Sequence, residues 1–129
     1  MPRTLTRYLN LDASGRICLP QFYLDGVEPN TRLIFTIHHP SRRSLLIFTS
    51  NEWLEIRKLL SGGLLGNKKW ILGFSIEAGI RSRNRVAVPA MHRAFLGPTK
   101  MLEWVELDIG VELVPYQGSL STINVAGGI

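Results

Sequence analysis

Arginine is the residue type in this sequence whose placement most clearly permits a chemical function. Arg16 follows the carboxylate of Asp12 by four positions, and Arg81, Arg83 and Arg85 stand at alternate positions further along the chain. A guanidinium group donates hydrogen bonds in a planar fork that fits phosphate oxygens or the edge of a guanine base. An Asp four residues before an Arg can orient that fork through a charge-assisted bond. The pattern predicts binding to a polyanion.

Each of these arginine groups also has a purely structural interpretation. In an extended segment, Arg81, Arg83 and Arg85 would project from one face as a cationic stripe, but such a stripe also guards a strand edge against aggregation. Asp12 and Arg16 could form an ordinary ion pair in a turn. Arg3 and Arg7 could serve as an N-terminal arm on DNA or belong to a disordered terminus.

The distribution of charge supports a polyanionic partner. The chain of 129 residues carries a net charge of +5, and its pI is about 9.9. All 15 Lys and Arg residues lie in positions 1–100, whereas positions 101–129 contain four acidic residues and no base. Such a division is expected when one surface meets phosphates and another does not, although accidental surface composition remains an alternative.

Length and composition indicate a globular protein of about one domain. The apolar fraction of 45% is enough for a core. No apolar run is long enough for a membrane span, and the N-terminus lacks the apolar stretch of a secretory signal, so we expect a cytoplasmic protein without a membrane partner. Cys18 cannot form an internal disulfide, and its apolar neighbours predict that it is buried.

An internal repeat organises the chain. When Arg16 is aligned with Arg85, residues 11–29 fall into register with residues 80–98. In both segments Arg is followed by apolar, small and apolar residues and then Pro. Gly15 matches Asn84, which is chemically sensible because both residues tolerate positive φ in a tight turn. The match predicts two copies of one supersecondary unit.

Each unit is expected to contain a strand, a turn, a short strand that Pro ends, a brief helical turn, and a hairpin. The first hairpin is predicted at residues 32–37 and 44–49, and the second at residues 101–107 and 111–115. Between the units, residues 52–60 predict a helix capped by Ser50 or Asn51. Its packing face would contain Trp53, Ile56, Leu59 and Leu60. A second short helix is expected to begin near Asn67, with a strand as the alternative.

Neither catalysis nor metal binding is indicated. The sequence contains no G-x-S-x-G elbow, phosphate-cradling Gly loop, H-E-x-x-H helix or Cys/His couple, and no pair of carboxylates stands out as acid and base. His38 and His39 are adjacent and would face opposite sides of a strand, which disfavours zinc. His92 is expected to meet a partner or solvent. We therefore expect no cofactor, no metal, no small-molecule substrate and no enzymatic activity.

The repeated motif resembles a known family. Asp12-Ala13-Ser14-Gly15-Arg16 followed by Ile17-Cys18-Leu19-Pro20 resembles the D-x-x-G-R-hydrophobic-x-hydrophobic-P signature of the AbrB-type swapped-hairpin DNA-binding fold. The duplication, with a Trp-bearing helix between the copies, resembles the MraZ family of bacterial transcriptional regulators. The resemblance covers roughly residues 8–116.

The resemblance implies a fold, an assembly and a partner. The fold would be mainly β with short helices, a duplicated AbrB-like, swapped-hairpin, double-psi-type β-barrel with two pseudo-symmetric halves in one chain. Residues 1–63, with the Trp53 helix, would form the first half and residues 64–116 the second. Separately, the uncharged, Gly- and Ser-containing stretch 117–129 predicts a flexible C-terminal tail or a strand added late to a partner. Copies of the chain would form a homo-oligomer, in the family a ring, whose D-x-x-x-R loops face promoter DNA at the nucleoid.

One position departs from the family pattern. Asp12 and Arg16 match the first loop, but the second loop has Arg81 where the family has Asp, although Arg85 is retained. Arg81 cannot accept a hydrogen bond. The second loop is therefore either a more basic and less ordered DNA loop or one that has lost this role.

Three functions follow from these patterns. The first is sequence-specific, salt-sensitive DNA binding by a transcriptional regulator, through Arg16, Arg85, Arg81, Arg83, Asp12, Arg7 and Arg3. The second is a protein-interaction module, an antitoxin-like or assembly subunit with a degenerate second DNA loop. RNA binding is the third. It is disfavoured because the aromatic residues lie among apolar neighbours rather than among the Lys and Arg residues.

Overall fold

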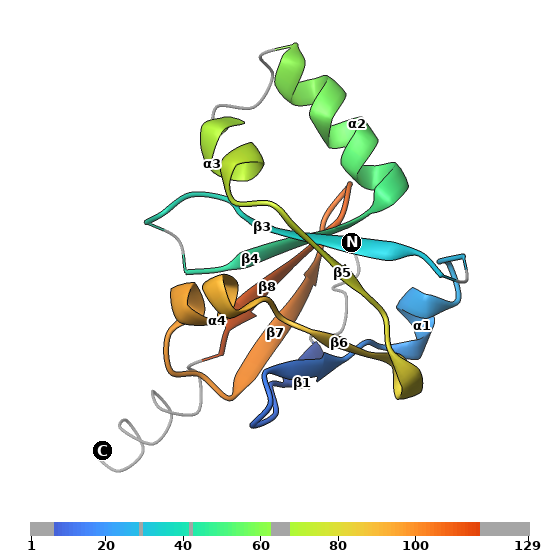
Figure 1. Cartoon of the computed structure of the whole chain (residues 1–129), viewed down its shortest axis with the longest axis vertical. Coiled ribbons are helices and arrows are strands. Elements are labelled where there is room, and N and C mark those ends of the chain that lie inside the picture. The colour runs from blue at the N-terminus through green and yellow to red at the C-terminus, as the bar shows by residue number, and fades with distance from the viewer. Residues whose placement is uncertain (1–6, 29, 42, 63–67, 117–129) are drawn as a thin grey trace, which may run out of the picture.

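A computed structural model describes residues 7–28, 30–41, 43–62 and 68–116. These residues form eight β-strands, four α-helices and one 3-10 turn (Figure 1). In chain order the elements are β1 (Arg7–Asn10), β2 (Arg16–Cys18), α1 (Gln21–Leu24), β3 (Arg32–Ile37), β4 (Leu45–Thr49), α2 (Ser50–Ser61), α3 (Lys68–Gly73), β5 (Ile76–Gly79), η1 (Ser82–Asn84), β6 (Arg85–Ala87), α4 (Ala90–Leu96), β7 (Met101–Glu106) and β8 (Val111–Pro115). The prediction of a mainly β fold with short helices is confirmed. None of the described helices has the length and apolar character needed to cross a membrane.

The strands form two separate sheets. Six strands lie in the order β1-β7-β8-β4-β3-β5 with antiparallel neighbours, so β1 and β5 are the edges. β2 and β6 form a two-stranded antiparallel ribbon. Within the described ranges the large sheet is not closed on itself. The closed barrel and the division into two halves therefore stay predictions.

The spacing of the sequence repeat recurs in the secondary structure. β1 and β5 begin 69 residues apart, and so do β2 and β6, α1 and α4, and β3 and β7. β1 pairs with β7 and β5 pairs with β3, so the first strand of each repeat lies beside the hairpin of the other. The registers agree as well, because Arg7 opposite Trp104 is equivalent to Ile76 opposite Phe35. The strand pairing thus reproduces the repeat.

The main core is built from equivalent positions of the two repeats. Four such pairs are buried: Ile17 and Val86, Leu19 and Val88, Leu33 and Leu102, and Phe35 and Trp104. Burying one side chain of this kind contributes roughly 1.5–3 kcal/mol. The inward-facing residues of the β2–β6 ribbon therefore hold it against the large sheet.

The predicted central helix is confirmed as α2, but its cap differs from the prediction. Thr49, not Ser50 or Asn51, is the N-cap: its Oγ1 accepts a hydrogen bond from the N–H of Glu52 at 3.2 Å. The Glu52 carboxylate in turn accepts from the N–H of Thr49 at 2.9 Å, which completes a capping box. The cap moves back one residue because the chain is still extended at Thr49, where the strand ends.

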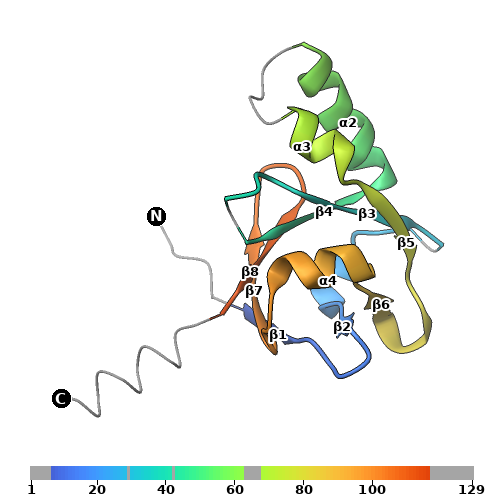
Figure 2. The ribbon, with the colours of Figure 1, turned by 60° about the vertical axis from the view of Figure 1, so that its left-hand side comes forward.

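The predicted packing face of α2 is also confirmed. Ile56 and Leu60 are buried, and Trp53 and Leu59 pack beside them in a second apolar cluster. α3 follows where a short helix was expected, although Asn67 lies outside the described residues. In Figures 1 and 2, α2 and α3 lie together at one end of the molecule.

His92 contradicts the expectation of a solvent or partner contact. Its side chain is fully buried, and its Nε2 donates a hydrogen bond to the carbonyl oxygen of Phe74 at 2.7 Å. Burial lowers the pKa of the His92 imidazole. His92 is buried because the orientation of α4 directs His92 and Leu96, one helical turn apart, toward the sheet.

Candidate nucleic-acid interface

The β2–β6 ribbon places the predicted arginines on one surface. Ile17 lies opposite Val86, and both are buried; Arg16 lies opposite Ala87, and Arg85 opposite Cys18. Side chains alternate between the two faces of a strand, so Arg16 and Arg85 both belong to the outer face of the ribbon. Diagonal neighbours in such a pair are roughly 7–8 Å apart. Two residues 69 positions apart in the sequence thus present a pair of guanidinium groups together.

The ribbon has an approximate twofold symmetry. Beyond its ends, the N–H of Leu19 donates to the carbonyl oxygen of Asn84, and the N–H of Val88 donates to that of Gly15, each at 2.9 Å. Leu19 is equivalent to Val88 and Gly15 to Asn84, so the two bonds are counterparts in which the donor repeat and the acceptor repeat are exchanged. Because β2 and β6 run antiparallel, the turns before the two strands lie at opposite ends of the ribbon. Both turns lie on the side of the molecule away from α2 (Figures 1 and 2).

The carboxylate of Asp12 organises the first turn. Its Oδ1 accepts hydrogen bonds from the N–H groups of Ser14 at 2.8 Å and Arg16 at 3.0 Å. The Arg16 guanidinium lies 3.6 Å from Oδ2, and both side chains are about 40% exposed, at 41% and 39%. Gly15 completes the turn with a φ of 79°. The carboxylate therefore orders the backbone, and the Arg16 side chain stays partly exposed, although its Nε is buried.

Electrostatics links this carboxylate to both arginines. The hydrogen bond from the backbone N–H of Arg16 is the main cause that holds the pKa of Asp12 below its usual range. A hydrogen bond from Ser14 and the charges of Arg16 and Arg85 act in the same direction. The register of the ribbon, in which Arg85 is a diagonal neighbour of Arg16, explains why the charge of Arg85 acts on the first turn.

The second turn has the same length but a different shape. The N–H of Arg81 donates to the carbonyl oxygen of Arg85 at 2.6 Å, as that of Asp12 donates to Arg16 at 3.0 Å. Arg83 and Asn84 both have positive φ, 59° and 60°, as in a type I′ turn. The expected extended stripe is wrong, because the chain reverses at these residues: Arg83 stands at the tip, and Arg81 and Arg85 stand at the two ends.

Cys18 is exposed, which contradicts the prediction of a buried thiol. Its neighbours Ile17 and Leu19 point inward, so the alternation of the strand turns Cys18 outward. Its Sγ lies 3.6 Å from the carbonyl oxygen of Arg83. Because only one face of the ribbon is covered, the apolar neighbours of Cys18 in the sequence did not predict its exposure correctly.

Arg93 joins the site without having been predicted. A Cβ atom placed on Gly15 would lie 2.5 Å from Cδ of Arg93, so this side chain packs directly over the first turn. The Nε of Arg93 donates to the carbonyl oxygen of Val88 at 3.2 Å. No sequence motif pointed to Arg93, because the equivalent position of the first repeat is occupied by Leu24.

Two other predicted arginines lie elsewhere. Arg7 is on edge strand β1, where its Cζ stacks 4.2 Å from the ring centre of Phe22. It is exposed but does not belong to the ribbon. Arg3 lies outside the described residues.

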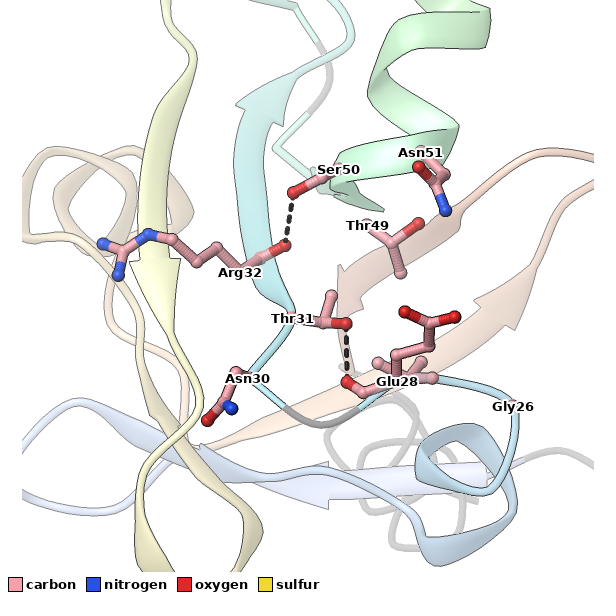
Figure 3. A pocket seen from close by; sticks show the side chains of 9 residues that line it. Gly26, Glu28, Asn30, Thr31, Arg32, Thr49, Ser50 and Asn51 are labelled. Atoms are coloured by element: carbon pink, nitrogen blue, oxygen red, sulfur yellow. Dashed lines mark hydrogen bonds between the residues drawn. The ribbon is translucent and has the colours of Figure 1, made fainter.

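A polar pocket of about 430 Å³ at the start of α2 is a poorer candidate for phosphate binding (Figure 3). Its side chains include Glu28, and its only arginine, Arg32, is directed toward β5, where its Nε lies 2.9 Å from Glu77. Ser50 and Thr31 donate to the carbonyl oxygens of Arg32 and Glu28, respectively. A carboxylate and an engaged guanidinium do not favour an anion.

Fold and site together define a class of protein: a small, basic, mainly β chain with an internal repeat that presents arginines from a paired ribbon. Six proteins, each bearing the name transcriptional regulator MraZ, match its sequence. No protein-family model matches it. These six matches support the MraZ family as the family of this chain.

Three of these relatives illustrate the degree of similarity. The protein of Azoarcus sp. (strain BH72) is 29% identical over 101 residues, which cover 73% of this chain and 67% of the relative. That of Shewanella frigidimarina is 31% identical over 97 residues, with 67% and 62% covered. That of Aromatoleum aromaticum is 26% identical over 112 residues, with 82% and 69% covered. The chain thus spans about two thirds of the length of these relatives.

Proposed function

We propose that this protein is a DNA-binding transcriptional regulator that contacts the phosphate backbone through Arg16 and Arg85. The observation that carries the proposal is the register of the β2–β6 ribbon, which sets both arginines on one outer face. The names of the relatives support the same role. The proposed function requires no catalytic group.

The composition of the two turns suits this contact. Residues 11–20 contain one carboxylate, Asp12, and residues 80–93 contain none, whereas the two segments together hold five arginines. Phosphate contacts position a protein on DNA, and forked donors also read guanine in the major groove. Arg81 and Arg83 would add phosphate contacts from the second turn, and Arg93 would do so beside the first.

The same proposal includes a fold and an assembly. The exchange of β1 and β5 between the repeats supports a duplicated swapped-hairpin unit, with residues 1–63 and 64–116 as its halves. A homo-oligomer, such as a ring, would present many copies of the ribbon to repeated sites on promoter DNA. We place this assembly in the cytoplasm, on the nucleoid. Arg3 and the tail at 117–129 lie outside the described residues.

A salt titration tests the DNA contact. The protein is titrated onto a DNA fragment from its own upstream region at several salt concentrations, beside the double variant Arg16→Ala/Arg85→Ala. Loss of two charge-assisted contacts should weaken binding on the order of a hundredfold at low salt. It should also reduce the slope of log affinity against log salt by roughly 2.

The matched control is Arg57→Ala/Lys58→Ala, which removes the same charge from the exposed face of α2. It should bind nearly as wild type. Equal affinities of wild type and the ribbon variant would reject the proposed site. Equal losses of affinity in both double variants would show that the loss follows net charge and not the ribbon.

A second function is favoured by one observation, the guanidinium of Arg81 in place of an organising carboxylate. A basic face whose second turn lacks this carboxylate suits an acidic protein partner, as in an antitoxin-like or assembly subunit. Co-purification of a stoichiometric protein, without nucleic-acid absorbance and without a mobility shift on any DNA, would favour this alternative.

A further inference from the structure

An apolar pocket lies between α3 and α4, apart from the arginine ribbon. Its volume is about 370 Å³, within the range of sites that enclose small molecules. Trp70 and Phe74 stack along one wall with ring centres 5.9 Å apart and planes at 14°. Ile37, Met91 and Phe95 contribute further apolar surface, and Met91 is 41% exposed. The lining suits a planar hydrophobic group.

Cations accompany this apolar lining. The Nζ of Lys69 lies 5.1 Å from the ring centre of Trp70. Arg43 reaches the end of α4, where a Cβ placed on Gly97 would lie 2.5 Å from its Nη1. The stretches of sequence around the lining residues, 36–49, 68–76 and 86–102, contain no Asp or Glu. Glu112 approaches this region, but it is buried and accepts a hydrogen bond from Ser44. The charge around the pocket therefore favours an anion.

A buried polar atom adds a specific requirement. His92 lines the pocket, and its Nε2 must carry the proton because it bonds to the carbonyl oxygen of Phe74. Nδ1 is then an acceptor, and in the described part of the chain it has no hydrogen-bond partner. A buried acceptor without a partner costs free energy. Because Nδ1 has no accessible surface in the structure, a ligand N–H or O–H would reach it only after a small shift of the ring or of the pocket lining.

We propose that the pocket between α3 and α4 binds a small aromatic anion, a planar ring system that carries one acidic group and one hydrogen-bond donor. The rings insert beside Trp70 and Phe74, and the acidic group remains at the mouth near Lys69 and Arg43. This site is independent of the proposed DNA contact, because none of its lining residues belongs to the β2–β6 ribbon.

Two fluorescent probes of nearly the same shape test the proposal on the full chain. 8-Anilinonaphthalene-1-sulfonate has the rings, the N–H and a sulfonate, whereas N-phenyl-1-naphthylamine lacks only the sulfonate. The sulfonate probe should bind saturably with one site per chain. Lys69→Gln/Arg43→Gln should weaken it roughly fivefold to tenfold and should leave the neutral probe within about twofold.

A filling variant and two controls locate the site. Ala94 lies on the exposed part of α4 and lines the pocket, so Ala94→Trp should abolish binding of both probes without unfolding the protein, which circular dichroism checks. Leu54→Ala, at the exposed apolar residue of α2, and Arg57→Gln should change neither affinity.

Two results would overturn the proposal. One is unchanged binding of the sulfonate probe in the charge variant or in Ala94→Trp. The other is binding that occurs only as light scattering shows the oligomer dissociating, which would identify a second copy as the occupant; the β7–β8 tip, with Leu107 between Glu106 and Asp108, has suitable chemistry.

Discussion

The turn at residues 12–16 and the turn at residues 81–85 reach the same ribbon by different means. Both have the same length and end in an equivalent backbone hydrogen bond. The first is ordered by the carboxylate of Asp12 and a single glycine, whereas the second uses two consecutive residues with positive φ. The comparison teaches that the ribbon determines where the arginines stand, and that the turn determines how firmly they are held and how much charge surrounds them.

The helices behind the turns differ too. Arg93 of α4 packs over the first turn, whereas its equivalent in α1, Leu24, packs against the main core. The second repeat therefore contributes charge to both turns. The first repeat supplies the ordering carboxylate and one arginine, Arg16, whereas the second supplies four arginines: Arg81, Arg83, Arg85 and Arg93.

The two turns should differ most in how much stability is lost when a residue with positive φ is substituted. Gly15→Ala should lower the free energy of unfolding by about 1–2 kcal/mol, because φ is 79° and the new methyl group meets Arg93. Asn84→Gly should change it by less than about 0.5 kcal/mol, since glycine adopts this conformation readily. Urea denaturation measures both. Gly73→Ala, where a Cβ meets nothing within 4 Å, is the control, and a neutral Gly15→Ala would refute the distinction.

DNA that contacts both arginines should cover both ends of the outer face of the ribbon. Cys18 and Ala87 are exposed on its outer face, beside Arg85 and Arg16. Alkylation of Cys18, and of the single thiol in Cys18→Ala/Ala87→Cys, should slow about tenfold when DNA is present at ten times its dissociation constant. Protection of position 18 alone would show that the two turns do not share one DNA surface.

A smaller effect is expected when the second turn is given the acidic residue of the first. Arg81→Asp should weaken DNA binding a few-fold and reduce the salt slope by about 0.9, because one phosphate contact is lost. Lys58→Glu on α2 makes the same change of charge far from the ribbon. If Arg81→Asp strengthened binding at every salt concentration, order rather than charge would limit the second turn.

The smallest effect concerns the acid limb of stability. The pKa of Asp12 is lowered in the folded protein, chiefly by the hydrogen bond from the N–H of Arg16. Its contribution is complete above the unfolded pKa, near 3.9, and is lost as the pH falls through the lower folded pKa. Asp12→Asn should therefore flatten the decline of Tm below about pH 4. Asp108→Asn is the matched control, and identical acid limbs for wild type and Asp12→Asn would contradict the assigned role.

Much of the fold was predictable because it depends on short-range patterns. β3 has the predicted bounds, β7 ends one residue earlier than expected, and α2 packs with the predicted face. The equivalence of the turns could be predicted as well, since Gly15 and Asn84 share a requirement for positive φ. These features follow from short patterns in the sequence and from their repetition, so they could be predicted without the structure.

The errors fall where neighbours distant in the sequence decide. Cys18 was expected to be buried and His92 to meet solvent or a partner, but Cys18 faces solvent and His92 is enclosed by Phe74 and the sheet. Arg93 lacked any motif, and only its packing over Gly15 brought it to the site. Burial depends on what covers a face, which local sequence does not encode.

A duplicated, basic, mainly β chain with an arginine at the end of each turn could be predicted from the order of the residues alone. That those arginines stand together follows from the folded structure, because β2 and β6 pair across 69 residues in one register. A shift of one residue would turn Arg16 or Arg85 inward, and the burial of Ile17 and Val86 opposes that shift. Core packing at the centre of the ribbon thus determines the chemistry of its outer face.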